Sequence, residues 1–152
     1  MKLPPKWINL DQRRDSGRFR STVLLVRVAY VSKMIGTAGR SPLSVAQIVG
    51  VSDVNNRRDH ICSSMLFHEG QVVQVIEGLR TDVDRLMRRL DGDARLGPLR
   101  LVCDVPITRR ALSEAVTVCH EPERTLEHVG LRDLDEVTPR SVEAMMEYRL
   151  AA

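Results

Sequence analysis

The sequence predicts an α+β fold of the ferredoxin-like type, in which two helices pack on one face of an antiparallel sheet. Short β-branched segments of alternating polarity recur, and two longer segments repeat their apolar residues with the period of a helix. Their order along the chain is β-α-β-β-α-β, followed by one further strand and a C-terminal helical extension. A length of 152 residues suits a single domain with its own core.

The first strand is expected over residues 22–32, and a helix follows it. Alternation along this strand places Tyr30 on the same face as two valines. Ser41 and Pro42 suit the N-cap and the first turn of the helix, and an apolar stripe at helical spacing comes after them. We expect this helix to end near residues 55–56, where two adjacent asparagines also suit a C-cap.

A β-hairpin and a second helix come next. The hairpin strands are expected over residues 61–68 and 71–76, because Glu69 and Gly70 between them form a typical turn. Thr81 is expected to cap the second helix, whose acidic first turn suits the helix dipole. This helix has the most regular amphipathic pattern in the chain.

The rest of the chain predicts two further strands and a last helix. The strands are expected over residues 99–105 and 115–119. Residues 121–137 are acidic and resemble a loop. The helix is expected over about residues 139–150, and its apolar stripe suits either the open face of the sheet or a partner.

Composition and charge exclude several classes of protein. With 23 basic and 20 acidic residues the net charge is only +3, too balanced to indicate nucleic-acid binding by itself. No apolar run approaches the roughly 18 residues of a membrane span, and no signal-peptide pattern occurs. The three cysteines have no zinc-site spacing, so we expect reduced thiols in a cytoplasmic protein. No enzyme motif is present, and we therefore expect no enzyme activity.

Residues 1–20 form a basic N-terminal arm that contains four arginines. Such an arm is either a solvated tail or a contact to nucleic acid, and a tail is the more common case. We divide the remainder into a folded domain over residues 21–119 and an extension over residues 120–152.

Gln74 is the most informative residue of the predicted sheet. It is the one uncharged polar residue in the apolar strand at residues 72–78. An unpaired buried amide costs roughly 1–3 kcal/mol, so Gln74 must be hydrogen-bonded, by default to an ordinary neighbour. Four further polar residues lie at element ends from which they could meet between the two helices: Tyr30, Asn55, Asn56 and Arg89.

These motifs together resemble the BLUF family of blue-light sensors. The shared motifs are Tyr-x-Ser, Asn-Asn, Gln-Val-Ile-Glu-Gly and Arg-Leu-x-x-Asp-x-Arg, and the spacing agrees without gaps from Asn56 through Gln74 to Arg95. The resemblance covers roughly residues 22–118. It implies a ferredoxin-like domain that binds FAD or FMN between its two helices and acts as a blue-light photoreceptor.

The resemblance also implies a role for each matching residue. Tyr30 would donate an electron and a proton to the excited flavin. Gln74 would be hydrogen-bonded between that tyrosine and the N5/O4 edge of the flavin, and light would rearrange its amide. Asn56, with Asn55 nearby, would hold the pyrimidine edge, and Arg89 would contact a pyrimidine carbonyl. The other matching residues are Ile48 and Leu90 around the ring, Asp93 and Arg95 near the ribityl-phosphate end, and Ser32 in the Tyr-x-Ser motif.

The chain departs from the family pattern at several positions. Two glycines of the second strand are replaced by His60 and Ser63, and the aromatic residue two positions before the glutamine is Val72. Leu96 replaces a histidine, and residues 115–118 lack the tryptophan or methionine that carries the signal in the family.

Two other readings therefore stay open. One is a flavin-free interaction module with the same fold, and the other is a nucleic-acid-associated regulator that uses the basic arm. For the photoreceptor we expect no effector domain, and hence output through a protein partner or a change of homo-oligomer.

Overall fold

The computed structural model describes residues 24–151, so the predicted basic arm lies outside the described residues. Five strands form one sheet in the order β4-β1-β3-β2-β5. The elements in chain order are β1 (Leu25–Lys33), α1 (Pro42–Arg58), β2 (Cys62–His68), β3 (Gln71–Leu79), α2 (Arg80–Asp91), β4 (Arg100–Pro106), β5 (Thr117–Val118), α3 (Pro122–Val129), the 3₁₀ helix η3 (Leu134–Glu136) and α4 (Pro139–Ala151).

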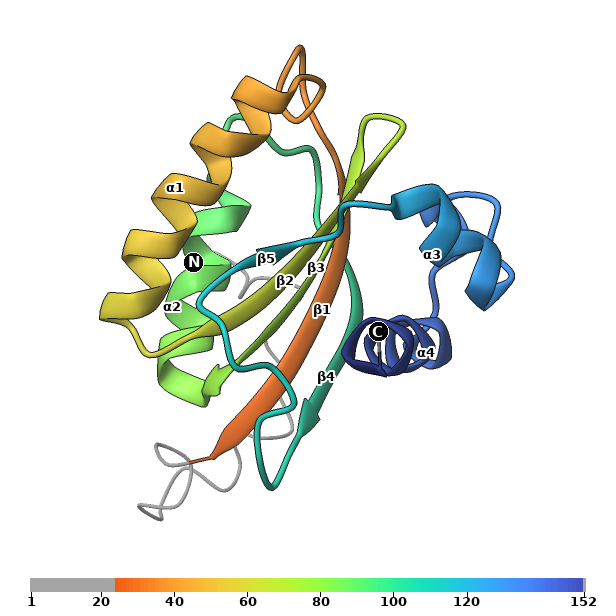
Figure 1. The fold of residues 1–152 in the computed structure, drawn as a ribbon. Coiled ribbons are helices and arrows are strands. Elements are labelled where there is room, and N and C mark those ends of the chain that lie inside the picture. Colours follow the sequence, from red (N-terminus) through yellow and green to blue (C-terminus); the bar gives the residue numbers. More distant parts are fainter. Residues whose placement is uncertain (1–23, 152) are drawn as a thin grey trace.

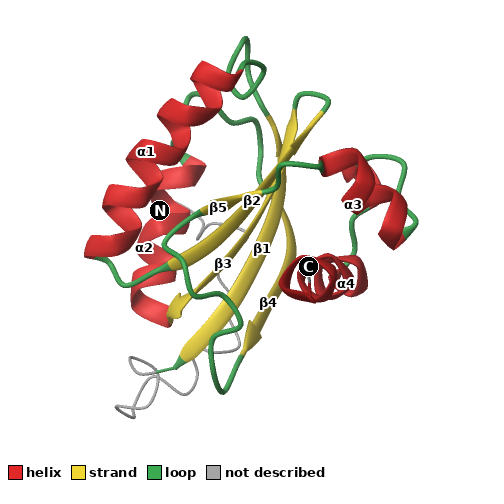
Figure 2. Ribbon diagram, viewed as in Figure 1, coloured by secondary structure: helices red, strands yellow, loops and turns green. Residues whose placement is uncertain are grey.

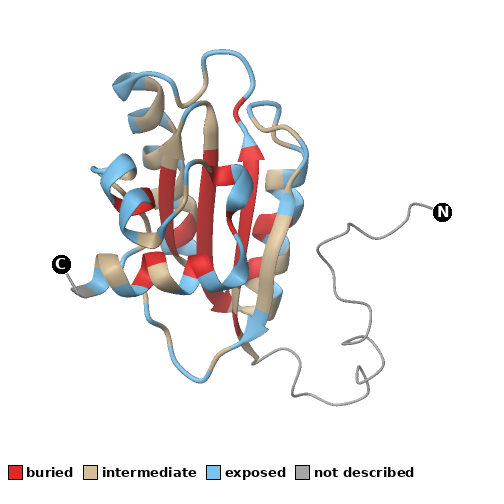
Figure 3. Ribbon diagram, turned by 90° about the vertical axis from the view of Figure 1, so that its right-hand side faces the viewer, coloured by how far each residue is buried: buried red, intermediate tan, exposed pale blue. Residues whose placement is uncertain are grey.

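The sheet is the middle of three layers (Figure 1). Helices α1 and α2 cover one face, and α3 and α4 cover the other. Each face has its own apolar core, one under α1 and α2 and the other under α4. Buried residues therefore concentrate in the central strands (Figure 3). The predicted α+β ferredoxin-like fold is confirmed.

The edge strand β5 differs from the predicted antiparallel sheet, because it runs parallel to β2. After β4 the chain crosses from one edge of the sheet to the other through a long loop (Figure 2). The chain therefore enters β5 running in the same direction as β2, and the two strands pair in parallel. Only Thr117 and Val118 pair there, fewer residues than the predicted strand over 115–119.

Strand register brings together two residues that are distant in the sequence. β1 and β3 are antiparallel, and Tyr30 lies directly opposite Gln74. The predicted alternation is confirmed, because Tyr30 belongs to the core under α1 and α2, whereas Ala29 and Val31 belong to the opposite core. The pairing of β1 with β4 shifts register between Ala29 and Tyr30. Such irregularities often re-aim side chains beside functional sites.

Two predicted helix ends were wrong. α1 begins as predicted, with the Ser41 side chain accepting a hydrogen bond from the Ser44 N–H, but it continues to Arg58 and is capped by Asp59. Asn56 is therefore buried inside the helix and is not a C-cap. α2 begins one residue before Thr81, directly after β3, and has no side-chain cap.

The segment predicted as an acidic loop contains α3 and η3. Leu126 and Leu134 are buried against the sheet, and this packing stabilises the helical structure. The acidic sequence of the segment alone does not indicate a helix. Gly130 ends α3 in the left-handed conformation, at φ +77°. The predicted last helix is present as α4 and covers the sheet, although Leu150 at its end is 56% exposed. None of the helices between residues 24 and 151 is long and apolar enough to cross a membrane.

Candidate functional site

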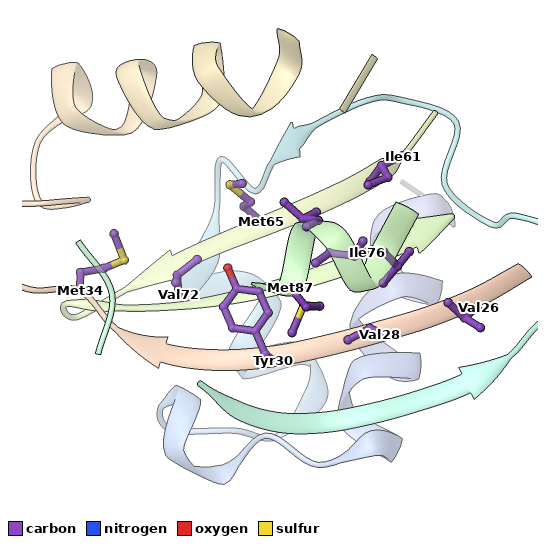
Figure 4. Packing of buried hydrophobic residues seen from close by; sticks show 11 residues of the cluster. Val26, Val28, Tyr30, Met34, Ile61, Met65, Val72, Ile76 and Met87 are labelled. Carbon is purple, nitrogen blue, oxygen red and sulfur yellow. The ribbon is translucent and has the colours of Figure 1, made fainter. Parts of the chain in front are cut away.

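A cavity of about 40 Å³ lies between the sheet and the two helices α1 and α2. Tyr30 and Gln74 contribute to its wall from β1 and β3. Figure 4 shows the Tyr30 ring on this face of the sheet, close to Met65, Val72 and Met87. Six of the ten predicted site residues line the cavity: Tyr30, Ile48, Gln74, Leu90, Asp93 and Arg95.

The Tyr30 hydroxyl donates a hydrogen bond of 2.5 Å to Gln74 Oε1. Both residues are only 2% exposed. This contact is the partner that a buried glutamine requires. The Gln74 Nε2 group has no hydrogen-bond partner among the described residues, although Gln74 lines the cavity. A ligand in the cavity would therefore meet an amide donor that the described residues leave unused.

The electrostatic surroundings keep the Tyr30 hydroxyl protonated. Burial raises the pKa of Tyr30 far above its ordinary value, and the Asp93 carboxylate raises that pKa further. Arg95 contacts Asp93 at 2.8 Å, and this hydrogen bond holds the pKa of Asp93 below its usual range. The Asp93–Arg95 ion pair thus lies in the cavity wall beside the tyrosine, and Arg95 offsets part of the effect of Asp93 on the pKa of Tyr30.

The walls of the cavity are mainly apolar. Ile48 of α1 and Leu90 of α2, the two residues that the resemblance placed around the ring, both line it. The cavity is also lined by Met34, Met65 and Phe67, which were not among the predicted site residues. The period of two along β2 could have indicated Met65 and Phe67, because this alternation places them on one face of the strand.

Asn56 is buried but does not line the cavity. Its Nδ2 group donates to Ser63 Oγ at 3.1 Å and to the Ala115 carbonyl at 2.8 Å. The Ser63 hydroxyl also donates to the same carbonyl, at 3.1 Å. A residue in a family glycine position therefore connects α1 to the segment just before β5. Asn55 is only half-buried, and the Ser32 hydroxyl donates to the Gly97 carbonyl at 3.0 Å.

Arg89 of α2 forms an ion pair with Asp59, the residue that caps the end of α1. Its Nη2 group lies 3.1 Å from Asp59 Oδ2. Asp59 also pairs with Arg58 and Arg85, and the hydrogen bond from Arg58 is the largest effect that lowers the pKa of Asp59. Asp59 was not among the predicted site residues, although a carboxylate directly after a basic helix end is a signal for such a pair.

Comparison with known protein families identifies the domain. The family model described as "Sensors of blue-light using FAD" matches residues 25–116. The chain belongs to the BLUF family. Its members sense blue light with FAD, so the family, the flavin cofactor and the photoreceptor function predicted from the motifs are confirmed. The family is defined by sensing, and the comparisons offer no support for either of the two other readings.

Solved structures of BLUF proteins have the same fold. The dark-state structure of BlrB is 26% identical, with a TM-score of 0.75, and the match covers 86% of this chain and 98% of BlrB. The photo-activated state of BlsA is 16% identical, with a TM-score of 0.74, over 85% of this chain and 96% of BlsA. A comparison with curated protein sequences gave no significant match.

A multidomain structure also matches. A bacterial light-regulated adenylyl cyclase is 23% identical with a TM-score of 0.59, and the match covers 84% of this chain but only 34% of the cyclase chain. The fold of the described residues thus also occurs as one part of a larger light-regulated enzyme.

Proposed function

We propose that the flavin ring of FAD lies in the cavity between α1 and α2, with the Tyr30–Gln74 pair as its light-responsive contact. The observation that supports this proposal is the 2.5 Å hydrogen bond between the two side chains, beside a Gln74 Nε2 donor that residues 24–151 leave unused. A flavin edge carries acceptors that such a donor can meet. Ile48 and Leu90 supply apolar surfaces for the two faces of the ring.

The cavity widens when the ring enters. Pockets for ligands of this size are about 300–1,000 Å³, far more than the 40 Å³ between the helices. Met34 and Met65 lie in the wall, and methionine side chains adapt easily to a new shape. Arg95 is 45% exposed at the same site, so its guanidinium can turn toward the phosphates of the cofactor.

The chemistry of the pair suits a reversible optical signal. Bound flavin supplies the absorption of blue light. Because its pKa is raised, Tyr30 remains a proton donor, and the Gln74 amide holds both a donor and an acceptor. Rotation or tautomerisation of that amide exchanges the two without moving a charge. The hydrogen bond to the flavin edge then changes, and the absorption shifts to the red.

The other predicted residues act around this pair. Asn55, Asn56 and Arg89 serve the pyrimidine side of the ring, and Ser32 stiffens the Tyr-x-Ser segment through its bond to Gly97. For Arg89 this role requires release from Asp59.

Output passes through a protein partner or a change in a homo-oligomer, without enzyme activity in the domain itself. Leu43, Val51 and Val54 of α1 are 70%, 55% and 67% exposed, which provides an apolar contact surface. The three cysteines, Cys62, Cys103 and Cys119, are free thiols, as suits the cytoplasm.

Absorption spectroscopy of the protein, first dark and then under blue light, tests the proposal. We expect a yellow protein with a reversible red shift. Gln74→Leu should keep the bound flavin and lose the shift, whereas Gln71→Leu on the same strand should keep both. Gln71 suits the control because its amide bonds Asp135 at the surface and not the cavity. An unchanged red shift in Gln74→Leu would refute the assigned role of Gln74 as the light-responsive contact. A protein that does not bind added flavin would refute the proposed flavin site between α1 and α2.

A further inference from the structure

A second and larger cavity lies on the opposite face of the sheet. Its volume is about 170 Å³, and it lies between the sheet and α4, with one side open to solvent beside the exposed Leu150. The sheet contributes Leu66, Val73 and Val75, and α4 contributes Met145 and Met146. All five side chains are apolar and buried, so the interior favours an apolar group.

Arg149 places a positive charge at this apolar cavity. It lies in the last turn of α4 and donates one hydrogen bond to the Ser64 hydroxyl, a residue that is 7% exposed. No ion pair to Arg149 forms among residues 24–151. A guanidinium has five N–H donors, so most of those on Arg149 are not used by the described residues.

Apolar walls and a cation whose donors are mostly unused by the described residues together favour one class of ligand. We propose that this cavity binds a small apolar carboxylate. The carboxylate would accept paired hydrogen bonds from Arg149, with Ser64 beside it, because guanidinium and carboxylate match in geometry and charge. The apolar part would lie between the sheet and α4.

The volume limits the size of that apolar part. A dry apolar cavity of about 150 Å³ accepts a benzene molecule, so this cavity suits a phenyl ring or a short branched chain. Two acidic residues of α4, Glu143 and Glu147, are exposed and line a separate groove with Arg27. They therefore lie outside the wall in which Arg149 would meet the carboxylate.

The site is independent of the flavin cavity. Strand β3 separates the two, because Gln74 faces one cavity and its neighbours Val73 and Val75 face the other. Binding of the carboxylate therefore requires neither flavin nor light, and it can be tested on the protein in the dark.

Titration of the full chain with phenylacetate, followed by calorimetry and by methyl NMR, tests this proposal. We expect saturable binding of one molecule, with shifts at the Met145, Met146 and Val75 methyl groups. Arg149→Gln should weaken binding at least about tenfold, because it removes a charge-assisted contact. Arg140→Gln is the matched control, because Arg140 is exposed at the other end of α4, and it should leave the affinity unchanged.

Two further measurements separate the charge from the cavity. Phenylacetamide, which is uncharged and similar in shape, should bind at least about tenfold more weakly than phenylacetate. Leu112→Trp should block binding by filling the cavity, since Leu112 lines it. No saturable binding, or equal binding by the wild type and Arg149→Gln, would overturn the proposal. Equal affinity for the amide and the carboxylate would also overturn it.

Discussion

Glu77 on β3 forms hydrogen bonds to the loop that leads to β5, and replacing Glu77 by glutamine should destabilise the protein strongly. The residue is 0% exposed, and its carboxylate accepts four hydrogen bonds. Arg27 donates two of them, at 2.9 and 2.8 Å, and the N–H groups of Ala111 and Leu112 donate the others, at 2.9 and 2.7 Å. No other carboxylate among the described residues is so completely enclosed.

The expected loss follows from this geometry. The glutamine amide has one oxygen, so either the Arg27 pair or the two N–H groups of the loop must face an NH₂ group. Two bonds are lost, each worth about 1.5–3 kcal/mol when a charge takes part. The Arg27 side chain is 18% exposed, so hydrogen bonds to water replace part of the lost interaction energy. We therefore expect Glu77→Gln to lower the free energy of unfolding by about 3 kcal/mol, or Tm by about 6–12 °C.

Urea unfolding measures the loss, and hydrogen exchange identifies its cause. The amides of Ala111 and Leu112 should lose protection in Glu77→Gln by more than the global destabilisation requires. Glu127→Gln, at an exposed position of α3, should change the stability by less than about 0.5 kcal/mol. A loss below about 1 kcal/mol in Glu77→Gln, or unchanged protection of the two amides, would show that the carboxylate does not hold this loop.

Three further substitutions test other parts of the molecule. Tyr30→Phe should still bind flavin and be yellow, but its absorption should show no red shift under blue light. Tyr148→Phe, at the other tyrosine of the chain, should show the normal red shift. A normal shift in Tyr30→Phe would mean that another residue donates the electron and proton to the flavin. Arg58 and Arg89 lower the pKa of Asp59, so the ionised carboxylate stabilises the fold above about pH 4, and that contribution is lost as the pH falls through the lowered pKa. Unfolding free energies of wild type and Asp59→Asn should accordingly differ at pH 7 and converge in acid, and a constant difference would exclude this linkage. His60 has φ +54°, so His60→Gly should raise the stability by up to about 1 kcal/mol in thermal unfolding, whereas the same change at His120 should not.

Local pattern was sufficient to predict the elements that bury one regular face. Alternation in β1 assigned Tyr30 to the face that carries Val26 and Val28, and the structure places Tyr30 on that face, directly opposite Gln74. α3 was missed because its stability comes from Leu126 packing against distant strands, which no local window contains. The parallel direction of β5 was missed for the same reason, since it depends on how the chain crosses the sheet.

The cavity residues show a similar limit. The resemblance to the family implied Ile48, Leu90, Asp93 and Arg95 as site residues, and all four line the cavity. The direction of a side chain depends on its partners, however. Asn56 does not line the cavity, and its amide instead donates to Ser63 and to the Ala115 carbonyl. The residue type at position 56 therefore could not show whether its side chain lines the cavity, because its hydrogen-bond partners come from other parts of the chain.

The departures from the family pattern can be interpreted together in the structure. His60 keeps the left-handed backbone that a glycine would adopt, so that substitution preserves the path of the chain and adds strain. Ser63 does the opposite, because its hydroxyl adds contacts to Asn56 and to the Ala115 carbonyl. Residues 115–118 lack the tryptophan or methionine that the family carries there, and hydrogen bonds from Asn56 of α1 and from Ser63 reach the Ala115 carbonyl in this segment. Any rearrangement of α1 around a flavin ring must therefore either move the segment before β5 or break the bonds of Asn56 and Ser63.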